Sequence, residues 1–226
     1  MPISDNVPTY RNVSKELRHA VDEYHLRVND CRSCGICDIP ERPEHFSTRP
    51  VFRGNIPCDL LLVFPAPRRI DVLSNSPLRG VEGSVVDDVV NAMIEFYPRL
   101  RVGLITAVHC YPFDAEISDR DPTKDHRDPT KSEVHACYHA NVFRFMEMAK
   151  PRIVVLFGEV LKRYFPQTIP SVIYVTAKHP SSAIKSRTVD DYKRDLFYAV
   201  DKFLDQEGAV FICNKPARFT PRTKSG

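Results

Sequence analysis

The stretch Leu104-Ile-Thr-Ala-Val-His-Cys110-Tyr-Pro112 begins as an apolar run and ends in a cysteine and a proline turn. A short apolar run that stops at a turn is typical of a strand buried on both of its faces. Residues 106–109 would then stand at the carboxyl end of that strand, the edge where open α/β sheets bind their ligands. The stretch therefore predicts a central strand and, at its end, a functional edge.

Cysteines near this strand form a second pattern. Cys31 and Cys34 are spaced as Cys-x-x-Cys, and Cys137 falls early in an expected helix, so Cys110 can complete a set of four thiolates. Such a set suits a structural zinc, an iron-sulfur cluster or unligated buried thiols. Cys37 forms a second Cys-x-x-Cys with Cys34, so Cys31 and Cys37 are able to exchange roles.

Composition limits the class of protein. With 226 residues, of which 42% are hydrophobic and 10% aromatic, the chain can bury one substantial core. Its formal net charge of +3 permits nucleic-acid binding without requiring it. No apolar run approaches the roughly 18 residues of a membrane span, and the seven cysteines suit a reducing compartment. We expect a soluble, intracellular monomer in the cytoplasm or nucleoid.

Apolar runs and helical spacing alternate along the chain. Buried strands are expected over residues 59–64, from residue 104, and over residues 152–157 and 171–176. Helices are expected over residues 13–28, after a capping signal at Ser84 and Asp87, after the capping box Thr130-Lys-Ser-Glu133, before Phe165 and after Thr188. This alternation predicts a three-layer α/β/α domain around a mostly parallel, four-stranded sheet. We expect a single domain over residues 1–213 and a basic tail over residues 214–226.

The cysteines and several other short motifs follow one another between Cys31 and Ile184. They are Cys31-x-x-Cys34, the Ala66-Pro67 loop with Pro77-Leu78-Arg79-Gly80 and Gly83, Cys110, Arg127-Asp-Pro-Thr-x-x-Glu133-x-x-x-Cys137, Ile153-Val-Val-Leu-Phe-Gly158 and His179-Pro-Ser181. In order and spacing they resemble the iron-sulfur uracil-DNA glycosylases called family 4. The resemblance implies an α/β/α domain that flips a uracil-type base out of DNA and hydrolyses its glycosidic bond. It also implies a [4Fe-4S] cluster on Cys31, Cys34, Cys110 and Cys137, with zinc as the alternative metal.

The catalytic motifs depart from that family at three positions. Pro65 stands where the family has an acidic residue, which leaves Asp71 as the carboxylate of that loop. Leu78 replaces the aromatic residue on which the family stacks the flipped base. Ala107 replaces the asparagine that reads the uracil edge, so selection of uracil by that amide is absent. His179 is retained, and would donate a hydrogen bond to a pyrimidine carbonyl as negative charge develops on the base.

The resemblance thus implies a site with three parts. These are the catalytic residues His179 and Asp71, the base-binding residues Ala66, Pro67, Leu78 and Ala107, and the DNA-binding residues Ser181, Ser182, Ile184, Lys185 and Arg187. The two serines and Ile184 would form a minor-groove wedge, while the basic residues, with Arg68 and Arg69, would contact phosphates. The structural alternatives are a solvated basic rim and, for His179, a loop histidine that caps local backbone.

Two functions fit these residues. The first is a DNA N-glycosylase with altered specificity, acting on duplex or single-stranded DNA. Loss of the asparagine and of the aromatic ring would widen its pocket for a modified or larger pyrimidine, and Asp71 would position the water. The second is a DNA-binding relative that has lost hydrolysis. We favour the glycosylase because both His179-Pro-Ser181 and Asp71 are present.

Overall fold

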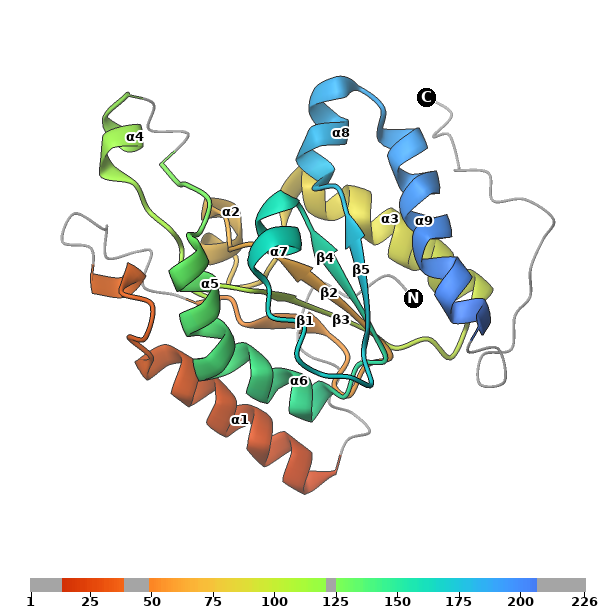
Figure 1. Cartoon of the computed structure of the whole chain (residues 1–226), viewed down its shortest axis with the longest axis horizontal. Helices are drawn as coiled ribbons and strands as arrows, with labels where there is room; N and C mark the ends of the chain where they lie inside the picture. The colour runs from red at the N-terminus through yellow and green to blue at the C-terminus, as the bar shows by residue number, and fades with distance from the viewer. Residues whose placement is uncertain (1–13, 39–48, 121–124, 207–226) are drawn as a thin grey trace.

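A five-stranded sheet of order β1-β3-β2-β4-β5 runs through the centre of the computed structural model (Figure 1). The structure describes residues 14–38, 49–120 and 125–206. The strands are β1 Phe52–Gly54, β2 Leu60–Phe64, β3 Val102–Thr106, β4 Ile153–Phe157 and β5 Ile173–Ala177. Strands β2 to β5 pair in parallel, and β1 pairs antiparallel with β3. The predicted mostly parallel α/β sheet is therefore confirmed.

The prediction of four strands was wrong by one edge strand. Strand β1 is three residues long, and it aligns Phe52 with Ile105 and Gly54 with Gly103. Such a short segment within a proline-rich connection shows no period from which a strand is recognised. The free edge of β3 supplies the hydrogen-bonding partner, so this strand is set by tertiary structure rather than by local sequence.

Helices cover both faces of the sheet, and Figure 1 shows them as two separate layers. One layer holds α1 Lys15–Asp30, α5 Lys131–Cys137, the π-helix η4 Tyr138–Val142 and α6 Phe143–Ala149, together with α7 Glu159–Tyr164. The other holds α3 Gly80–Phe96, α8 Pro180–Ser186 and α9 Val189–Gln206. The short helices η2 Ile36–Asp38, α2 Arg69–Leu73 and α4 Ala115–Arg120 lie in connections.

Side chains of the central strand β2 alternate between the two layers. Leu61 and Val63 pack into the core beneath α1 and α6, whereas Leu60, Leu62 and Phe64 pack beneath α3 and α9. All five side chains are at most 3% exposed. This double burial explains why the strand reads as a continuous apolar run instead of an alternating one.

One of the two helix starts predicted from capping signals is confirmed, and the other differs. The predicted capping box forms, because the Thr130 hydroxyl accepts from the Glu133 backbone N–H and the Glu133 carboxylate accepts from the Thr130 N–H. Helix α3, in contrast, begins at Gly80, one turn before the expected cap at Ser84. The backbone at Leu78 passes close to Gly83 in the first turn of this helix. A Cβ on Gly83 would lie 2.2 Å from the Leu78 carbonyl oxygen. That close approach requires glycine.

Two expectations concern parts of the chain away from the sheet. The predicted basic tail over residues 214–226 lies outside the described residues. Among the described helices, none has the length and apolar character needed to cross a membrane.

We predict that Gly83→Ala destabilises the protein although alanine is the better helix former. The added methyl must displace the backbone at Leu78, at a cost of about 1–3 kcal/mol, which exceeds the roughly 1 kcal/mol gained from helix propensity. Ser84→Ala, at the exposed neighbouring position, is the matched control and should change stability little. Chemical denaturation measures both variants. A Gly83→Ala protein more stable than the wild type would contradict the close approach of Leu78.

Candidate functional site

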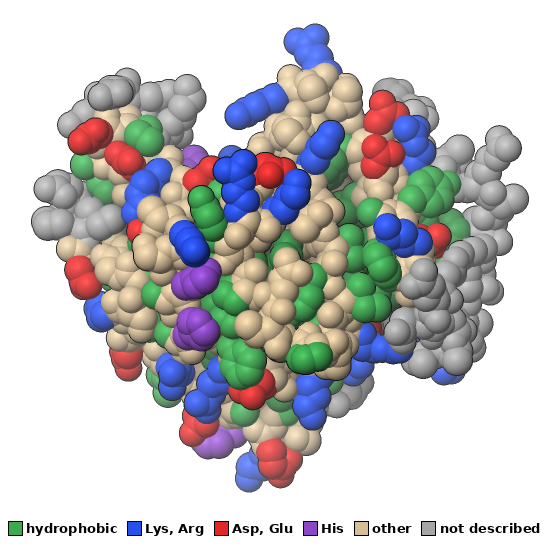
Figure 2. Space-filling view, viewed as in Figure 1, with side chains coloured by type: hydrophobic (Ala, Val, Ile, Leu, Met, Phe, Trp, Pro, Cys, Tyr) green, Lys and Arg blue, Asp and Glu red, His purple; other side chains and the backbone are tan. Residues whose placement is uncertain are grey.

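A cavity of about 190 Å³ lies at the carboxyl edge of the sheet, where loops from four parallel strands meet. It is lined by Pro65, Ala66, Pro67 and Arg68 after β2, Pro112 and His126 to Pro129 after β3, Gly158, Glu159 and Val160 after β4, and His179 and Ser181 after β5. This is the edge at which sheets of this type bind ligands. Figure 2 shows a notch here between α4 and α8, with both basic and acidic side chains on its floor.

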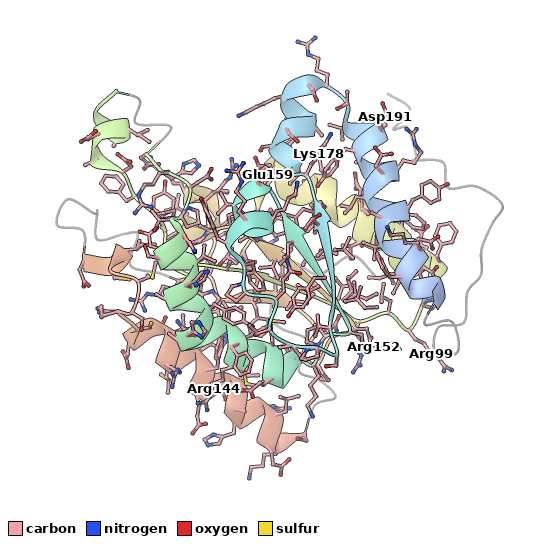
Figure 3. All side chains as sticks on the ribbon, in the orientation of Figure 1. Arg99, Arg144, Arg152, Glu159, Lys178 and Asp191 are labelled. Atoms are coloured by element: carbon pink, nitrogen blue, oxygen red, sulfur yellow. The ribbon has the colours of Figure 1, made fainter. Side chains whose placement is uncertain are left out.

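Labelled side chains in Figure 3 show which edge this is. Glu159 follows β4 and Lys178 follows β5, and both lie on the upper side of the molecule in that view. Arg152 precedes β4 and Arg99 precedes β3, and both lie on the opposite side. The cavity therefore belongs to the carboxyl ends of the strands, as the sequence predicted from residues 106–109.

His179 is held in one orientation on the wall of the cavity. It is the N-cap of α8, where its Nδ1 accepts from the Ser181 backbone N–H at 3.3 Å and lies 2.8 Å from the Ser181 hydroxyl. Because Nδ1 is an acceptor, the ring proton belongs on Nε2. Burial, together with the positive charges of Arg68 and Lys185, lowers the pKa of His179 to about 4. At neutral pH the ring is thus an uncharged imidazole with one N–H donor.

Two phenylalanines at the ends of β2 and β4 support this histidine. Phe64 and Phe157 stack with ring centroids 4.2 Å apart and planes 8° from parallel. The Phe64 and His179 rings form a T-shaped contact, with centroids 5.8 Å apart and planes at 86°. An apolar support of this kind fixes the ring and keeps water from one side of it. Phe64 was not recognised from sequence as part of the site, because it reads there as an ordinary core residue.

The Asp71 side chain is buried and hydrogen-bonded to the backbone, and it does not face the cavity. Its carboxylate accepts from the backbone N–H of Arg68 at 2.8 Å and of Arg79 at 2.6 Å, and it is 3% exposed. Burial raises its pKa, opposed by these hydrogen bonds. Asp71 is not among the residues that line the cavity. The side chain instead ties the loop after β2 to the start of α3.

The predicted base-binding residues divide into two groups. Ala66 and Pro67 line the cavity. Leu78 is 5% exposed within the core beneath α3, and Ala107 is fully buried, with its backbone N–H donating to the Phe64 carbonyl at 2.7 Å. Neither Leu78 nor Ala107 lines the cavity. The structure therefore brings together half of this predicted set.

The predicted DNA-binding residues lie on or just after α8. Ser182, Lys185 and Arg187 are exposed, and Ser181 lines the cavity. Ile184 is half-buried, because it packs against the core beneath α3 and α9. The other expected phosphate contacts already have partners: Arg68 pairs with Glu82 at 2.9 Å and Arg69 with Asp125 at 3.6 Å.

The segment after β3 contributes cavity residues that the sequence analysis did not single out. His126, Arg127 and Asp128 all line the cavity. Arg127 makes two hydrogen bonds to the Glu133 carboxylate, at 2.6 and 2.8 Å, which fix the segment to α5. The motif Arg127-Asp-Pro-Thr-x-x-Glu133 marked this segment in the sequence. A polar loop, however, does not show which of its side chains face a cavity.

Five cysteines approach one another between α1, the end of β3 and α5. The Cys37 and Cys110 sulfurs are 2.9 Å apart, and a hydrogen bond to Cys110 lowers the pKa of Cys34 to about 7. The Asn141 amide lies 3.3 Å from the Cys31 sulfur and 3.8 Å from that of Cys137. Cys58 lies apart, against Gly103 of β3.

The spacing of these sulfurs differs from that expected around a bound zinc ion. Throughout the described residues, no group of three or more His, Cys, Asp or Glu side chains is arranged to hold a metal ion as it stands. Two thiolates on one tetrahedral zinc would be about 3.8 Å apart, since each Zn–S bond is about 2.3 Å. The 2.9 Å contact between Cys37 and Cys110 is shorter than that spacing. The donor set is nevertheless composed of the soft ligands that zinc and iron-sulfur clusters select.

A buried arginine lies beside these thiols. Arg49 is 6% exposed, and its guanidinium donates to the Val28 carbonyl and, at 3.0 Å, to the Cys37 sulfur. Within the described ranges, no carboxylate is paired with it. A buried cation without an anion costs several kcal/mol, and the Cys37 sulfur is one of the two acceptors that hold this guanidinium.

His109 joins this region to the amino-terminal helix. It is 1% exposed, and its Nε2 lies 2.9 Å from the Tyr24 hydroxyl of α1. Burial, with Arg49 close by, lowers its pKa to about 3, so the ring is neutral. His109 therefore acts as a buried polar link between the end of β3 and α1.

A comparison with protein families agrees with this geometry. Residues 52–200, from β1 into α9, match the family model described as uracil DNA glycosylase superfamily. No curated protein matches the chain. The match includes every strand of the sheet and all residues that line the cavity, and it spans well over half of the chain. The chain therefore belongs to the uracil-DNA glycosylase superfamily.

Proposed function

We propose that this protein is a DNA N-glycosylase that flips and excises a uracil-related or modified pyrimidine. One observation carries the proposal: His179 lines the cavity as a neutral imidazole whose Nδ1 is engaged by Ser181, which leaves the Nε2–H as donor. As the glycosidic bond lengthens, negative charge moves onto the base and its carbonyl oxygens. A fixed N–H donor aimed at such an oxygen binds the transition state more strongly than the ground state.

The size of the cavity supports a single base as ligand. At about 190 Å³ it is smaller than the roughly 300–1,000 Å³ of sites for drug-sized molecules. A base inside the duplex cannot reach it, so the nucleotide must be flipped. Ala107 is buried outside the cavity lining and has no side-chain amide, so nothing at that position reads uracil, and a modified pyrimidine is the better candidate.

The surface beside the cavity suits DNA. Lys185 and Arg187 are exposed on the same loop-helix unit that carries His179, so phosphate contacts there would orient the flipped nucleotide. Ser181, Ser182 and Ile184 are proposed as the wedge that fills the vacated base stack. The half-buried position of Ile184 gives such a wedge a rigid base.

A DNA-binding protein without hydrolysis is the second candidate, and one observation favours it. Both carboxylate oxygens of Asp71 accept backbone hydrogen bonds, so the carboxylate expected to position water is already occupied. A relative that lost the water-activating group would keep the cavity and the basic surface. Base release decides between the two candidates.

We further propose that the thiols bind a [4Fe-4S] cluster, as in the family 4 enzymes that the sequence resembles, with zinc as the alternative. Cys31, Cys34, Cys110 and Cys137 are the proposed ligands, and Cys37 is the competing thiol. The buried guanidinium of Arg49 supports an anionic thiolate site. A bound cluster would supply a cross-link between the segment after α1, the end of β3 and α5.

If the thiols hold this cluster, the purified protein should be brown and contain about four irons per chain. Cys110→Ser should lose both the colour and thermal stability, because it removes a ligand at the junction of three segments. Cys58→Ser, which alters a buried thiol outside the group, is the control and should keep the iron. Iron, sulfide and zinc analyses measure the outcome. Stoichiometric zinc in a colourless protein, or no metal at all, would refute the cluster.

His179→Ala should separate chemistry from binding. Loss of the donor is expected to slow base release on the order of 10²-fold under single-turnover conditions, with little change in DNA affinity. Lys185→Ala should instead weaken binding and reduce its salt dependence by about one counter-ion. The measurements are abasic-site formation on oligonucleotides carrying uracil and a panel of modified pyrimidines, and equilibrium binding to the same DNA. Failure of the wild type to release any of these bases would exclude the glycosylase.

A further inference from the structure

Hydrolysis of a glycosidic bond is assisted by a carboxylate that is free to take a proton from water. Most carboxylates at this edge of the sheet have other partners. Asp71 accepts backbone N–H groups, Glu82 pairs with Arg68, Glu133 pairs with Arg127, and Asp125 accepts from the Tyr111 hydroxyl and pairs with Arg69. None of these four lines the cavity.

Two acidic residues do line the cavity, and they differ in their partners. Glu159 is 70% exposed at the start of α7, and its carboxylate lies 3.5 Å from Lys162. Asp128 is also exposed, but no described residue makes a hydrogen bond or ion pair with its carboxylate. Its backbone carbonyl accepts from Arg127 at 3.2 Å, which leaves the side-chain oxygens open.

The segment that carries Asp128 is held from both sides. Before it, the Arg127 backbone N–H donates to the Pro112 carbonyl at 3.1 Å, and the Arg127 guanidinium is clamped by Glu133. After it, Pro129 is buried and Thr130 caps α5. A carboxylate on so fixed a segment is preorganised, which is a requirement for a general base.

Sheet order separates the segment that carries Asp128 from the loop that carries His179. The strand order β3-β2-β4-β5 sets the loop after β3 and the loop after β5 at opposite ends of the lining. A base held by His179 leaves in the direction of β5, so a water on the β3 side approaches C1′ of the sugar from the opposite side. Displacement with the nucleophile opposite the leaving group requires this arrangement.

We propose that Asp128 is the general base that activates the water, a role that rests on the proposed glycosylase function. The water oxygen forms a bond to C1′ while the bond from C1′ to the base nitrogen breaks, and its electron pair stays on the base. The proton leaves the water for the Asp128 carboxylate and passes to solvent. The departing base, stabilised by the His179 N–H, takes up a proton from solvent. The products are the free base and a deoxyribose with a hydroxyl group at C1′.

The test compares Asp128→Asn with Glu147→Gln, which changes an exposed carboxylate of α6 away from the cavity. On a substrate that the wild type cleaves, Asp128→Asn should slow single-turnover base release by about 10²-fold or more and leave DNA affinity within about twofold. Glu147→Gln should release base at the wild-type rate. Added formate should restore part of the rate to Asp128→Ala, because a small carboxylate then occupies the vacated space. A purely structural role gives no such rescue.

The results distinguish an error in the role of Asp128 from an error in the proposed glycosylase function. Because Asp128 is exposed, thermal melts should show that Asp128→Asn and Asp128→Ala are both folded. If the wild type releases base and Asp128→Asn does so at the same rate, the general base lies elsewhere and the glycosylase stands. If Asp128→Asn changes only which base is preferred, the residue reads the base and the inference is overturned. A wild type that releases no base refutes both.

Discussion

Burial of β2 on both faces is the constraint on which the rest of the structure depends. Its side chains alternate between two cores, and its backbone pairs with β3 on one side and β4 on the other, so no part of the strand is left for a polar function. Chemistry is therefore confined to the loops at the carboxyl edge. Phe64, the last residue of β2, joins the two regions, because it stacks on Phe157 and supports His179.

Charged groups at this edge are used mainly to fix loops. Asp71 joins the loop after β2 to α3, and the Arg127–Glu133 pair joins the segment after β3 to α5. The Arg127–Glu133 pair is partly buried and bidentate, which makes it more effective than an exposed ion pair at holding one geometry. The loops lie outside the main sheet, and these carboxylates add hydrogen bonds that hold them in place. A motif carboxylate close to the cavity in sequence can thus be structural, whereas Asp128, three residues after the buried Asp125, is open.

Sequence predicted those parts of the structure that local patterns determine. Strands β2 to β5 are apolar runs, and the Thr130 capping box specifies the start of α5. Strand β1 and the early start of α3 depend on a partner edge and on the close approach of Leu78 to Gly83, which no local pattern contains. At the site, the family motifs located Ala66, Pro67 and His179. They did not show that Leu78 and Ala107 are buried or that Asp128 faces the cavity, because both depend on how separate loops meet.

The central claim is that His179 presents a neutral ring with its proton on Nε2 to the base. Nitrogen-15 NMR of the protein labelled at histidine measures the tautomer and the charge of this ring directly, with His179→Gln used to assign its signals. We predict an Nε2–H tautomer that remains neutral at pH 6 and titrates near pH 4, because burial and the nearby Arg68 and Lys185 charges oppose protonation. A ring protonated at pH 6, or a neutral ring with its proton on Nδ1, would contradict the claim.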